Sequence, residues 1–251
     1  MIKDFINGNK FRELCDFDFI SPNFKSNKKS YIIYSDLDRY VDAISFASQH
    51  RDKNFVLVSH NGDKTVEYTG LPLNIKAWYT QNLNFKHDKV FAIPIGLENP
   101  EWHPSKIPTM LKMPQSQKRV AKGFCQFNLG THPEERQGMA ESLSSNNIDV
   151  DSFDCVNGQN FFQYLFNLKI YKYCLCPRGN GIDTHRIWEA LYMGCMPVVK
   201  RHITHEFYEG QLPIIFVDEW KDFKDTECPA SSFENPILTM DYWKNRICQS
   251  L

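Results

Sequence analysis

The sequence predicts an α/β protein with two Rossmann-like parallel-sheet domains that face a cleft. Short runs of β-branched and aromatic residues alternate with helical patterns. This alternation stops in a proline-rich stretch and then restarts, and in the second half a glycine loop joins a strand to a helix. Open parallel sheets bind ligands beyond the carboxyl ends of their strands, so a ligand is expected in the cleft.

In the first half, apolar runs predict strands at residues 31–34, 55–59, 75–80 and 90–93. A helix is expected from Leu37, because apolar side chains then recur at helical spacing. The side chains that mark this buried face are Leu37, Tyr40, Val41, Ile44 and Ala47.

The best boundary between domains lies where prolines interrupt both patterns, at positions 100, 104, 108 and 114. We therefore expect an N-terminal acceptor-side domain at residues 1–115 and a C-terminal domain at 116–235. Residues 236–251 form a closing helix with Ile237, Met240, Trp243 and Ile247 at helical spacing.

The second domain repeats the alternation of strands and helices. Strands are expected at residues 121–128, 170–176, 196–199 and 213–217, and helices from residue 133, at 160–168 and at 183–193.

Charge and hydropathy exclude several classes of protein. Lys and Arg total 29 against 30 Asp and Glu, so no global field attracts nucleic acid or anionic lipid, and a polyanion must meet a local patch. No run of 18 apolar residues occurs, and the first residues are too polar for a secretory signal. We expect a cytoplasmic protein with no membrane span.

The segment at residues 171–199 carries the densest signal. An apolar strand leads into the loop Pro177–Gly181 and then into a helix that Asp183 or Thr184 is expected to cap. A helix N-terminus presents unpaired N–H groups, and Arg178 and Arg186 add donors that match phosphate oxygens. The segment therefore predicts a phosphate site.

On this helix His185 and Glu189 lie four residues apart, opposite the apolar face. A carboxylate one turn beyond a phosphate suits a ribose diol, which favours a nucleoside diphosphate across the helix start. The alternative is an ordinary strand–loop–helix unit in which Glu189 pairs with Arg186 or His185 on a solvated surface.

Residues 178–191 (RGNGIDTHRIWEAL) and 194–199 (GCMPVV) resemble the donor-nucleotide motif of exostosin-like glycosyltransferases, which have the two-domain GT-B fold. Three upstream pieces resemble the same family: 59–63 (SHNGD), 78–82 (WYTQN) and 93–99 (IPIGLEN). The resemblance spans about residues 55 to 220. It implies a GT-B-like fold and transfer of a sugar from a UDP- or GDP-linked donor to a glycan or another hydroxyl acceptor.

The resemblance implies phosphate contacts for Arg178 and Arg186 and a ribose contact for Glu189. Arg136 resembles the family's additional basic residue that reaches the diphosphate, and its alternative is a solvated arginine in a helix's first turn. The expected donor-binding residues are Arg136, Arg178, Gly179, Asn180, Gly181, Asp183, His185, Arg186 and Glu189. Animal exostosins carry a membrane anchor, so their acceptor is not carried over to this chain.

An inverting transfer, which the resemblance implies, needs a base for the acceptor hydroxyl. The segment 59–63 ends a predicted strand, and His60 and Asp63 are the catalytic candidates. The alternative for this segment is a tight Asn-Gly turn with a capping aspartate.

No metal or other cofactor is expected. Asp36 and Asp38 have the spacing of a GT-A metal pair, but the same spacing recurs at 16/18 and 149/151, and Asp36 is more simply the N-cap of the following helix. His202 and His205 have no carboxylate at ligand spacing.

Two other functions stay open. One is a non-catalytic module that binds a nucleotide or sugar. The other is a glycosyltransferase for hydroxymethylated bases in DNA, suggested by Lys25, Lys28 and Lys29 beside Phe24 and Tyr31. Nucleic acid is therefore a possible partner with weak support. In the sugar-transfer hypothesis Trp78, Tyr79 and Trp102 are candidates for stacking on a sugar.

Overall fold

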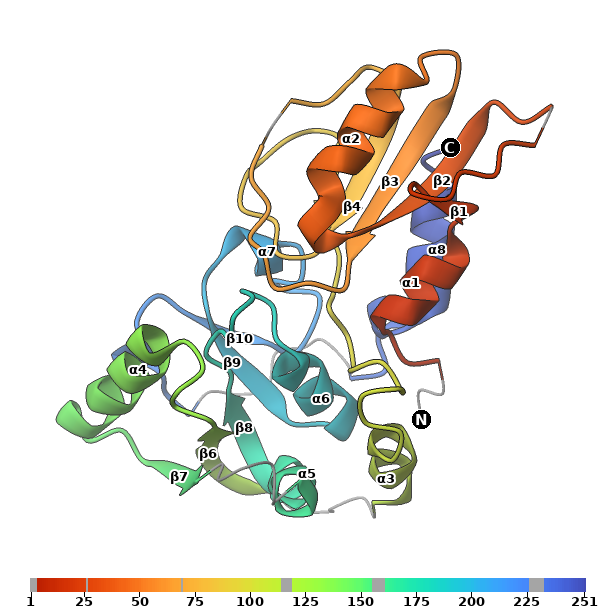
Figure 1. The fold of residues 1–251 in the computed structure, drawn as a ribbon. Helices are drawn as coiled ribbons and strands as arrows, with labels where there is room; N and C mark the ends of the chain where they lie inside the picture. Colours follow the sequence, from red (N-terminus) through yellow and green to blue (C-terminus); the bar gives the residue numbers. More distant parts are fainter. Residues whose placement is uncertain (1–3, 26, 69, 114–118, 155–160, 226–232) are drawn as a thin grey trace. The chain divides into compact units, whose positions relative to one another are not determined.

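The computed structural model describes residues 4–25, 27–68, 70–113, 119–154, 161–225 and 233–251. The chain forms two compact units. Unit 1 comprises Met1–Leu97, Gly181–Asp183 and Pro236–Leu251, and unit 2 comprises Glu98–Asn180 and Thr184–Asn235. Each unit holds a five-stranded sheet whose strands pair in parallel (Figure 1). The predicted α/β class with two Rossmann-like, GT-B-like sheets is confirmed.

The sheet of unit 1 has the order β1-β2-β3-β4-β5. Its strands are β1 Phe17–Asp18, β2 Ser30–Asp36, β3 Asn54–His60, β4 Ile75–Thr80 and β5 Val90–Ala92. The four predicted strands are therefore confirmed. The two-residue β1 is too short to give a periodic pattern in the sequence.

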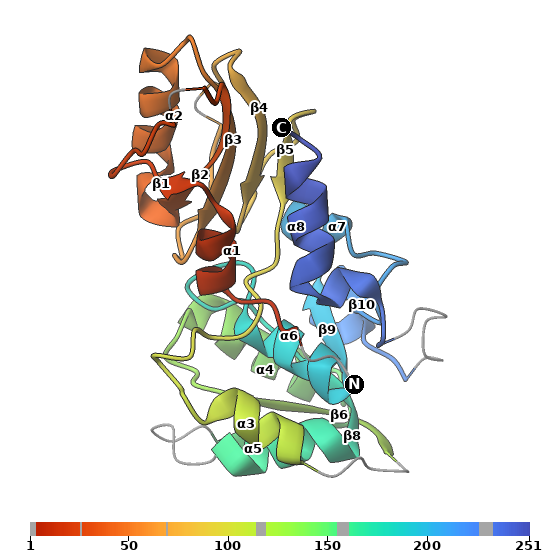
Figure 2. The ribbon, with the colours of Figure 1, turned by 90° about the vertical axis from the view of Figure 1, so that its right-hand side faces the viewer.

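Helices cover both faces of this sheet, as Figure 2 shows from its edge. On one face lies α2 Tyr40–Gln49, preceded by the 3-10 turn η1 Leu37–Arg39. Leu37, Tyr40, Ile44 and Ala47 are buried as predicted, but Val41 is exposed. The other face carries α1 Gly8–Leu14, which the sequence analysis missed, and α8 Met240–Cys248.

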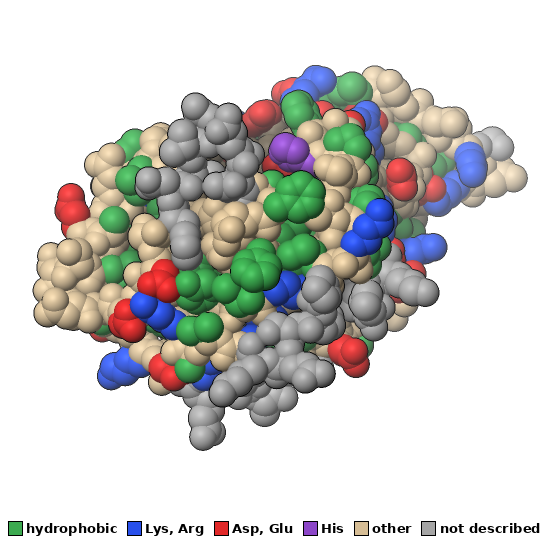
Figure 3. Space-filling view, turned by 90° about the horizontal axis from the view of Figure 1, so that it is seen from below, with side chains coloured by type: hydrophobic (Ala, Val, Ile, Leu, Met, Phe, Trp, Pro, Cys, Tyr) green, Lys and Arg blue, Asp and Glu red, His purple; other side chains and the backbone are tan. Residues whose placement is uncertain are grey.

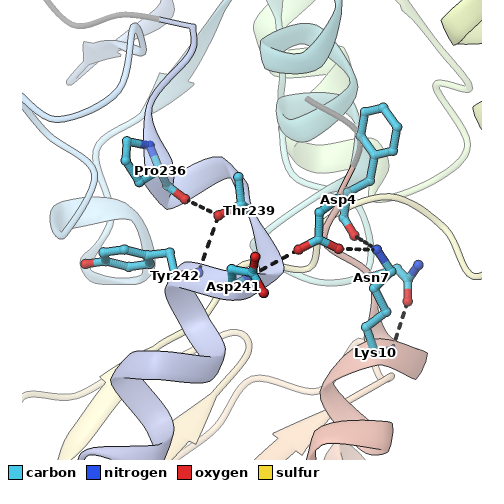
Figure 4. A network of polar contacts seen from close by, with 8 residues as sticks. Asp4, Asn7, Lys10, Pro236, Thr239, Asp241 and Tyr242 are labelled. Atoms are coloured by element: carbon cyan, nitrogen blue, oxygen red, sulfur yellow. Dashed lines mark hydrogen bonds and ion pairs between the residues drawn. The ribbon is translucent and has the colours of Figure 1, made fainter. Parts of the chain in front are cut away.

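The C-terminal segment belongs to unit 1 because it bonds to the start of the chain (Figure 4). Asp4 accepts a hydrogen bond from the backbone N–H of Asp241 and forms an ion pair with Lys10. The predicted closing helix is a 3-10 turn, η3 Pro236–Leu238, followed by α8, whose first turn is capped by the Thr239 hydroxyl.

The sheet of unit 2 contains β6 Val120–Phe127, β7 Val150–Asp154, β8 Tyr171–Leu175, β9 Met196–Lys200 and β10 Ile215–Val217. The helix α4 Pro133–Ser145 and the turn η2 Trp220–Asp222 pack on one face. The helices α5 Phe161–Ile170 and α6 His185–Met193 pack on the other. Three elements were not predicted: β7, α3 Lys106–Lys112 and α7 Ile203–Glu206.

The grouping of residues differs from the predicted ranges in three places, one of which is Gly181–Asp183 in unit 1. Residues 98–113 pack with unit 2 and the closing segment with unit 1. The predicted boundary at 115/116 lies outside the described residues. Among the helices of the described ranges, none is both long enough and apolar enough to cross a membrane.

Candidate functional site in unit 2

The strand order of unit 2 selects one place for a ligand. The order β10-β9-β8-β6-β7 reverses between β6 and β8, because the chain first adds β7 on one side and then returns to add β8 on the other. Open parallel sheets bind ligands beyond the carboxyl ends of the strands at such a reversal. The described strands of unit 1 follow one another in sequence order, with no reversal. The candidate site therefore consists of the segments that follow β6 and β8, with the start of α6.

Arg136 joins the two segments that border this reversal. It lies in the first turn of α4 and is buried. Its guanidinium donates to the backbone oxygen of Asn128 at 2.6 Å and to that of Arg178 at 3.1 Å. The alternative of a solvated arginine is therefore wrong, because the side chain forms part of the interior. Its contact with a diphosphate stays a prediction.

Two guanidinium groups surround one aromatic ring at the end of β6. The Cζ atoms of Arg136 and Arg186 lie 5.2 and 5.4 Å from the centre of the Phe127 ring. The ring face attracts each cation, so Phe127 helps to hold two like charges near each other at the carboxyl edge of the sheet.

Arg178 and Arg186 form no ion pair with a described residue, and the Glu189 carboxylate acts on Arg186 only at longer range. Arg178 bends back over its own loop and donates to the backbone oxygen of Asn180 at 3.0 Å. No carboxylate in the described part of the chain pairs with Arg178 or Arg186, and Arg186 forms no hydrogen bond with any described residue. The Nε atom of Arg186 is buried without a hydrogen-bond partner among the described residues, so this arrangement favours an anionic ligand that accepts from the guanidinium.

Further donors at this edge lack a protein partner. Thr184 occupies the N-cap position of α6 with only 9% of its surface exposed, and its hydroxyl has no hydrogen-bond partner in the described ranges. The same holds for Nδ1 of His132, which precedes α4. The predicted side-chain cap of α6 is therefore wrong, and the Thr184 hydroxyl lies unpaired at a helix N-terminus.

Gly179 lies against the Arg136 side chain: a β-carbon at this position would come within 3.4 Å of a guanidinium nitrogen. Asn180, the next residue, is exposed, and His185 is the partly buried first residue of α6. Unit 2 thus brings together six of the predicted donor-binding residues on three adjoining segments: Arg136, Arg178, Gly179, Asn180, His185 and Arg186.

Glu189 lies one turn further along α6 and is buried. Its Oε1 accepts from the Lys106 ammonium at 2.7 Å, and its Oε2 accepts from the Tyr164 hydroxyl at 2.7 Å. Burial alone raises the pKa of this carboxyl, but the charge and hydrogen bond of Lys106, the charge of His185 and the Tyr164 hydrogen bond outweigh burial and lower the pKa to about 2. Pairing with Arg186 or His185 on a solvated surface is therefore wrong. The ribose contact stays a prediction.

The remaining donor-binding candidates, Gly181 and Asp183, belong to unit 1. The Asn82 side-chain oxygen accepts the backbone N–H groups of Ile182 and Asp183 at 3.0 and 2.9 Å. The buried Asp183 carboxylate accepts the backbone N–H of Ile95 at 2.7 Å. Asp183 is thus engaged by the protein backbone and does not cap α6.

His60 is buried at the end of β3 and stacks on Phe11 with ring centres 5.1 Å apart. Its Nε2 lies 3.0 Å from the Pro94 carbonyl oxygen, so this nitrogen carries the proton, and Nδ1 accepts the Asn61 backbone N–H at 2.7 Å. Asp63 is exposed, and Asn61, two residues before it, lies in the left-handed region. The chain bends at Asn61, and Asp63 is the accessible member of the candidate pair.

Two of the three aromatic residues predicted to stack on a sugar lie in the interior of unit 1. Trp78 and Tyr79 are buried, and their polar atoms bond to Ser59, to the Arg246 backbone and to Ser250. Stacking of these two rings on a sugar is therefore wrong, whereas Trp102 in unit 2 is exposed.

The lysine cluster near residue 28 also has a structural explanation. Tyr31 is fully buried, Phe24 packs on the core of unit 1, and Lys28 pairs with Asp16. The two aromatic rings are thus not exposed for stacking on bases. Asp36 accepts from the Tyr34 hydroxyl and makes no side-chain cap. In the described ranges, no group of three or more His, Cys, Asp or Glu side chains is placed to hold a metal ion.

No protein-family model matches this chain, and no curated protein matches it. The likeness of its motifs to exostosin-like glycosyltransferases therefore stays a prediction from the sequence.

Four residues that organise these sites were not predicted from the sequence: Asn82, Lys106, Phe127 and Tyr164. Lys106 lies in the proline-interrupted stretch, where no periodic pattern marks a buried side chain. Tyr164 and Phe127 lie in apolar runs and look like ordinary core residues. Asn82 alone had a signal, because an Asn two residues after a predicted strand is a common left-handed residue.

Proposed function

We propose that this protein is a glycosyltransferase that uses a UDP- or GDP-linked sugar and binds the donor diphosphate in unit 2. The observation that carries the proposal is the pair of guanidinium groups on Phe127 at the strand-order reversal, with no described carboxylate on Arg178 or Arg186. The likeness of residues 178–199 to a donor-nucleotide motif supports the same assignment.

In this proposal the cations act on the leaving group. The acceptor oxygen attacks the anomeric carbon, and the sugar–phosphate bond breaks with its electron pair going to the nucleoside diphosphate. Arg136, Arg178 and Arg186 stabilise the charge that develops on the phosphate oxygens, with the Thr184 hydroxyl and the first N–H groups of α6. Such groups are fixed before the reaction, so they need little reorganisation during it.

A ligand screen tests the donor site. We expect a UDP- or GDP-linked sugar to raise the melting temperature, because a ligand that binds only the folded state stabilises it by mass action. Inorganic pyrophosphate should stabilise the protein less but measurably. If no nucleoside diphosphate, nucleotide sugar or pyrophosphate binds in calorimetry at millimolar concentration, the donor site is not where we propose.

We assign the general base to Asp63, since both ring nitrogens of His60 are engaged and the ring is buried. Replacing Asp63 with asparagine is expected to lower kcat by about 10²–10⁴-fold with little change in donor affinity. Transfer rates and calorimetry of the same variant measure the two quantities. An unchanged kcat assigns the proton transfer to another group.

The burial of His60 also favours a second candidate, a module that binds the nucleotide without chemistry. Incubation with the bound donor separates the two. An enzyme of this class slowly hydrolyses the donor even without acceptor, which mass spectrometry detects as free sugar and nucleoside diphosphate. A module leaves the donor intact while binding it.

A further inference from the structure

Arg186 and Glu189 lie three residues apart on α6, the spacing at which opposite charges on a helix usually pair. They do not pair here. Both oxygens of Glu189 are taken by Lys106 and Tyr164, and Arg186 has no hydrogen-bond partner among the described residues. Its guanidinium instead lies over the rings of Phe127 and Tyr164, at 5.4 and 6.0 Å.

Two further groups of unit 2, the Glu98 carboxylate and the Phe161 ring, hold Lys106 beside Glu189. It is a buried lysine at the first position of α3, with a second ion pair to Glu98 and its ammonium 5.4 Å from the centre of the Phe161 ring. Lys112, at the other end of α3, is exposed.

Lys106 is buried, whereas hydrophobic side chains are exposed on the outward side of α3 and α5. Figure 3 views the molecule from the side on which α3 and α5 lie in Figure 1, and hydrophobic side chains gather there. The exposed ones on these two helices are Leu111, Phe162 and Phe166. The lysine is thus buried on a helix that leaves a leucine exposed, which costs free energy unless its partners compensate.

We propose that Lys106 is a positioning residue: it occupies Glu189 and thereby keeps Arg186 available for the phosphate oxygens of the donor. The inference rests on the proposed function, since it needs an anion at Arg186. Without the ammonium, the Glu189 carboxylate would be buried with one hydrogen bond, and the basic residues that interact with it on the same helix are His185 and Arg186. Glu189 and the ligand would then compete for one guanidinium.

The test uses inorganic pyrophosphate and calorimetry on the full chain. Lys106→Met removes the charge but keeps most of the side-chain volume, and we expect pyrophosphate to bind at least about tenfold more weakly, the equivalent of one charged hydrogen bond. Adding Glu189→Gln to Lys106→Met should restore most of the affinity, because the competing carboxylate is gone. Lys112→Met, on the exposed end of α3, should bind as the wild type does.

A purely structural role predicts a different pattern. If Lys106 only supports the fold, affinity will follow thermal stability, and the double variant will bind no better than Lys106→Met. That result, or a wild-type affinity in a folded Lys106→Met, overturns the inference while leaving the donor site in place. If Lys106→Met does not fold, Glu189→Gln alone decides: retained pyrophosphate affinity supports the inference, and a tenfold loss contradicts it.

The proposed function fails in a distinguishable way. A wild-type protein that binds neither pyrophosphate nor a nucleoside diphosphate removes the donor site, and the role of Lys106 with it.

Discussion

Replacing Arg186 with methionine is expected to weaken nucleoside diphosphate binding by about 100-fold or more without destabilising the protein. Two charge-assisted hydrogen bonds to phosphate oxygens contribute about 1.5–3 kcal/mol each, which corresponds to this loss. In the free protein Arg186 has no described hydrogen-bond partner, so the substitution breaks no ion pair.

The stability of Arg186→Met distinguishes a ligand-binding arginine from a structural one. Methionine can still pack on the rings of Phe127 and Tyr164, and no hydrogen bond or ion pair to a described residue is lost. We expect the free energy of unfolding, measured with urea in the absence of ligand, to stay equal or to rise by up to about 1 kcal/mol. Replacing most other arginines of a folded interior lowers the free energy of unfolding.

Arg201→Met is the matched control. Arg201 is also in unit 2, but Glu209 and Asp218 pair with it on the surface. Its loss should leave ligand affinity unchanged, because this charge is already compensated. If Arg186→Met instead loses several kcal/mol of stability and binds pyrophosphate normally, Arg186 is a structural residue.

The fold could be predicted from the sequence where a pattern extends over several residues. The strand at Ile75–Thr80 and the helix from Pro133 follow directly from local apolar spacing. The strands that were not predicted are short or polar. The strand β1 has two residues, and three of the five residues of β7 are Asp or Ser. The spacing of apolar residues along the chain does not indicate which strands of the sheet will pair with such a short or polar segment.

The candidate site was predictable in kind but not in detail. The glycine loop and the arginines of residues 178–186 indicated an anion site, and Arg178, Gly179 and Arg186 do lie at the strand-order reversal. The partner of Glu189 could not be found in the sequence, because Lys106 is 83 residues away and lies in no periodic pattern. Whether a charged side chain is buried depends on its tertiary partner. The spacing of residues along one helix does not reveal that partner.

The three upstream motif pieces have a common structural place in unit 1. His60 bonds to the Pro94 carbonyl, Gln81 donates to the Gly62 carbonyl, and Ile95 donates to Asp183. These segments follow β3, β4 and β5 at one edge of the sheet, where residues 181–183 also bond to Asn82. These segments therefore form a structural junction in unit 1, and a proposal about chemistry has to be argued from the arginines of unit 2.

Replacing Asn82 with leucine is expected to destabilise this junction by about 4 kcal/mol. The buried side-chain oxygen accepts two backbone N–H groups, and each would be left without a partner at a cost of about 1–3 kcal/mol. The backbone φ of Asn82 is 51°, in the left-handed region, which adds about 1 kcal/mol for a bulky side chain. Urea unfolding of the variant measures the sum.

Asn82→Asp separates the hydrogen bonds from the volume of the side chain. Aspartate keeps the accepting oxygen and tolerates the left-handed region, so it should lose less than half as much stability as leucine. Gly181→Ala disrupts the same contact between Asn82 and residues 181–183, since its new methyl group would lie 2.8 Å from the Asn82 side-chain nitrogen. Because both changes break one contact, the loss in Asn82→Leu/Gly181→Ala should be smaller than the sum of the two single losses. Additive losses would mean that Asn82 stabilises unit 1 by contacts other than those with residues 181–183.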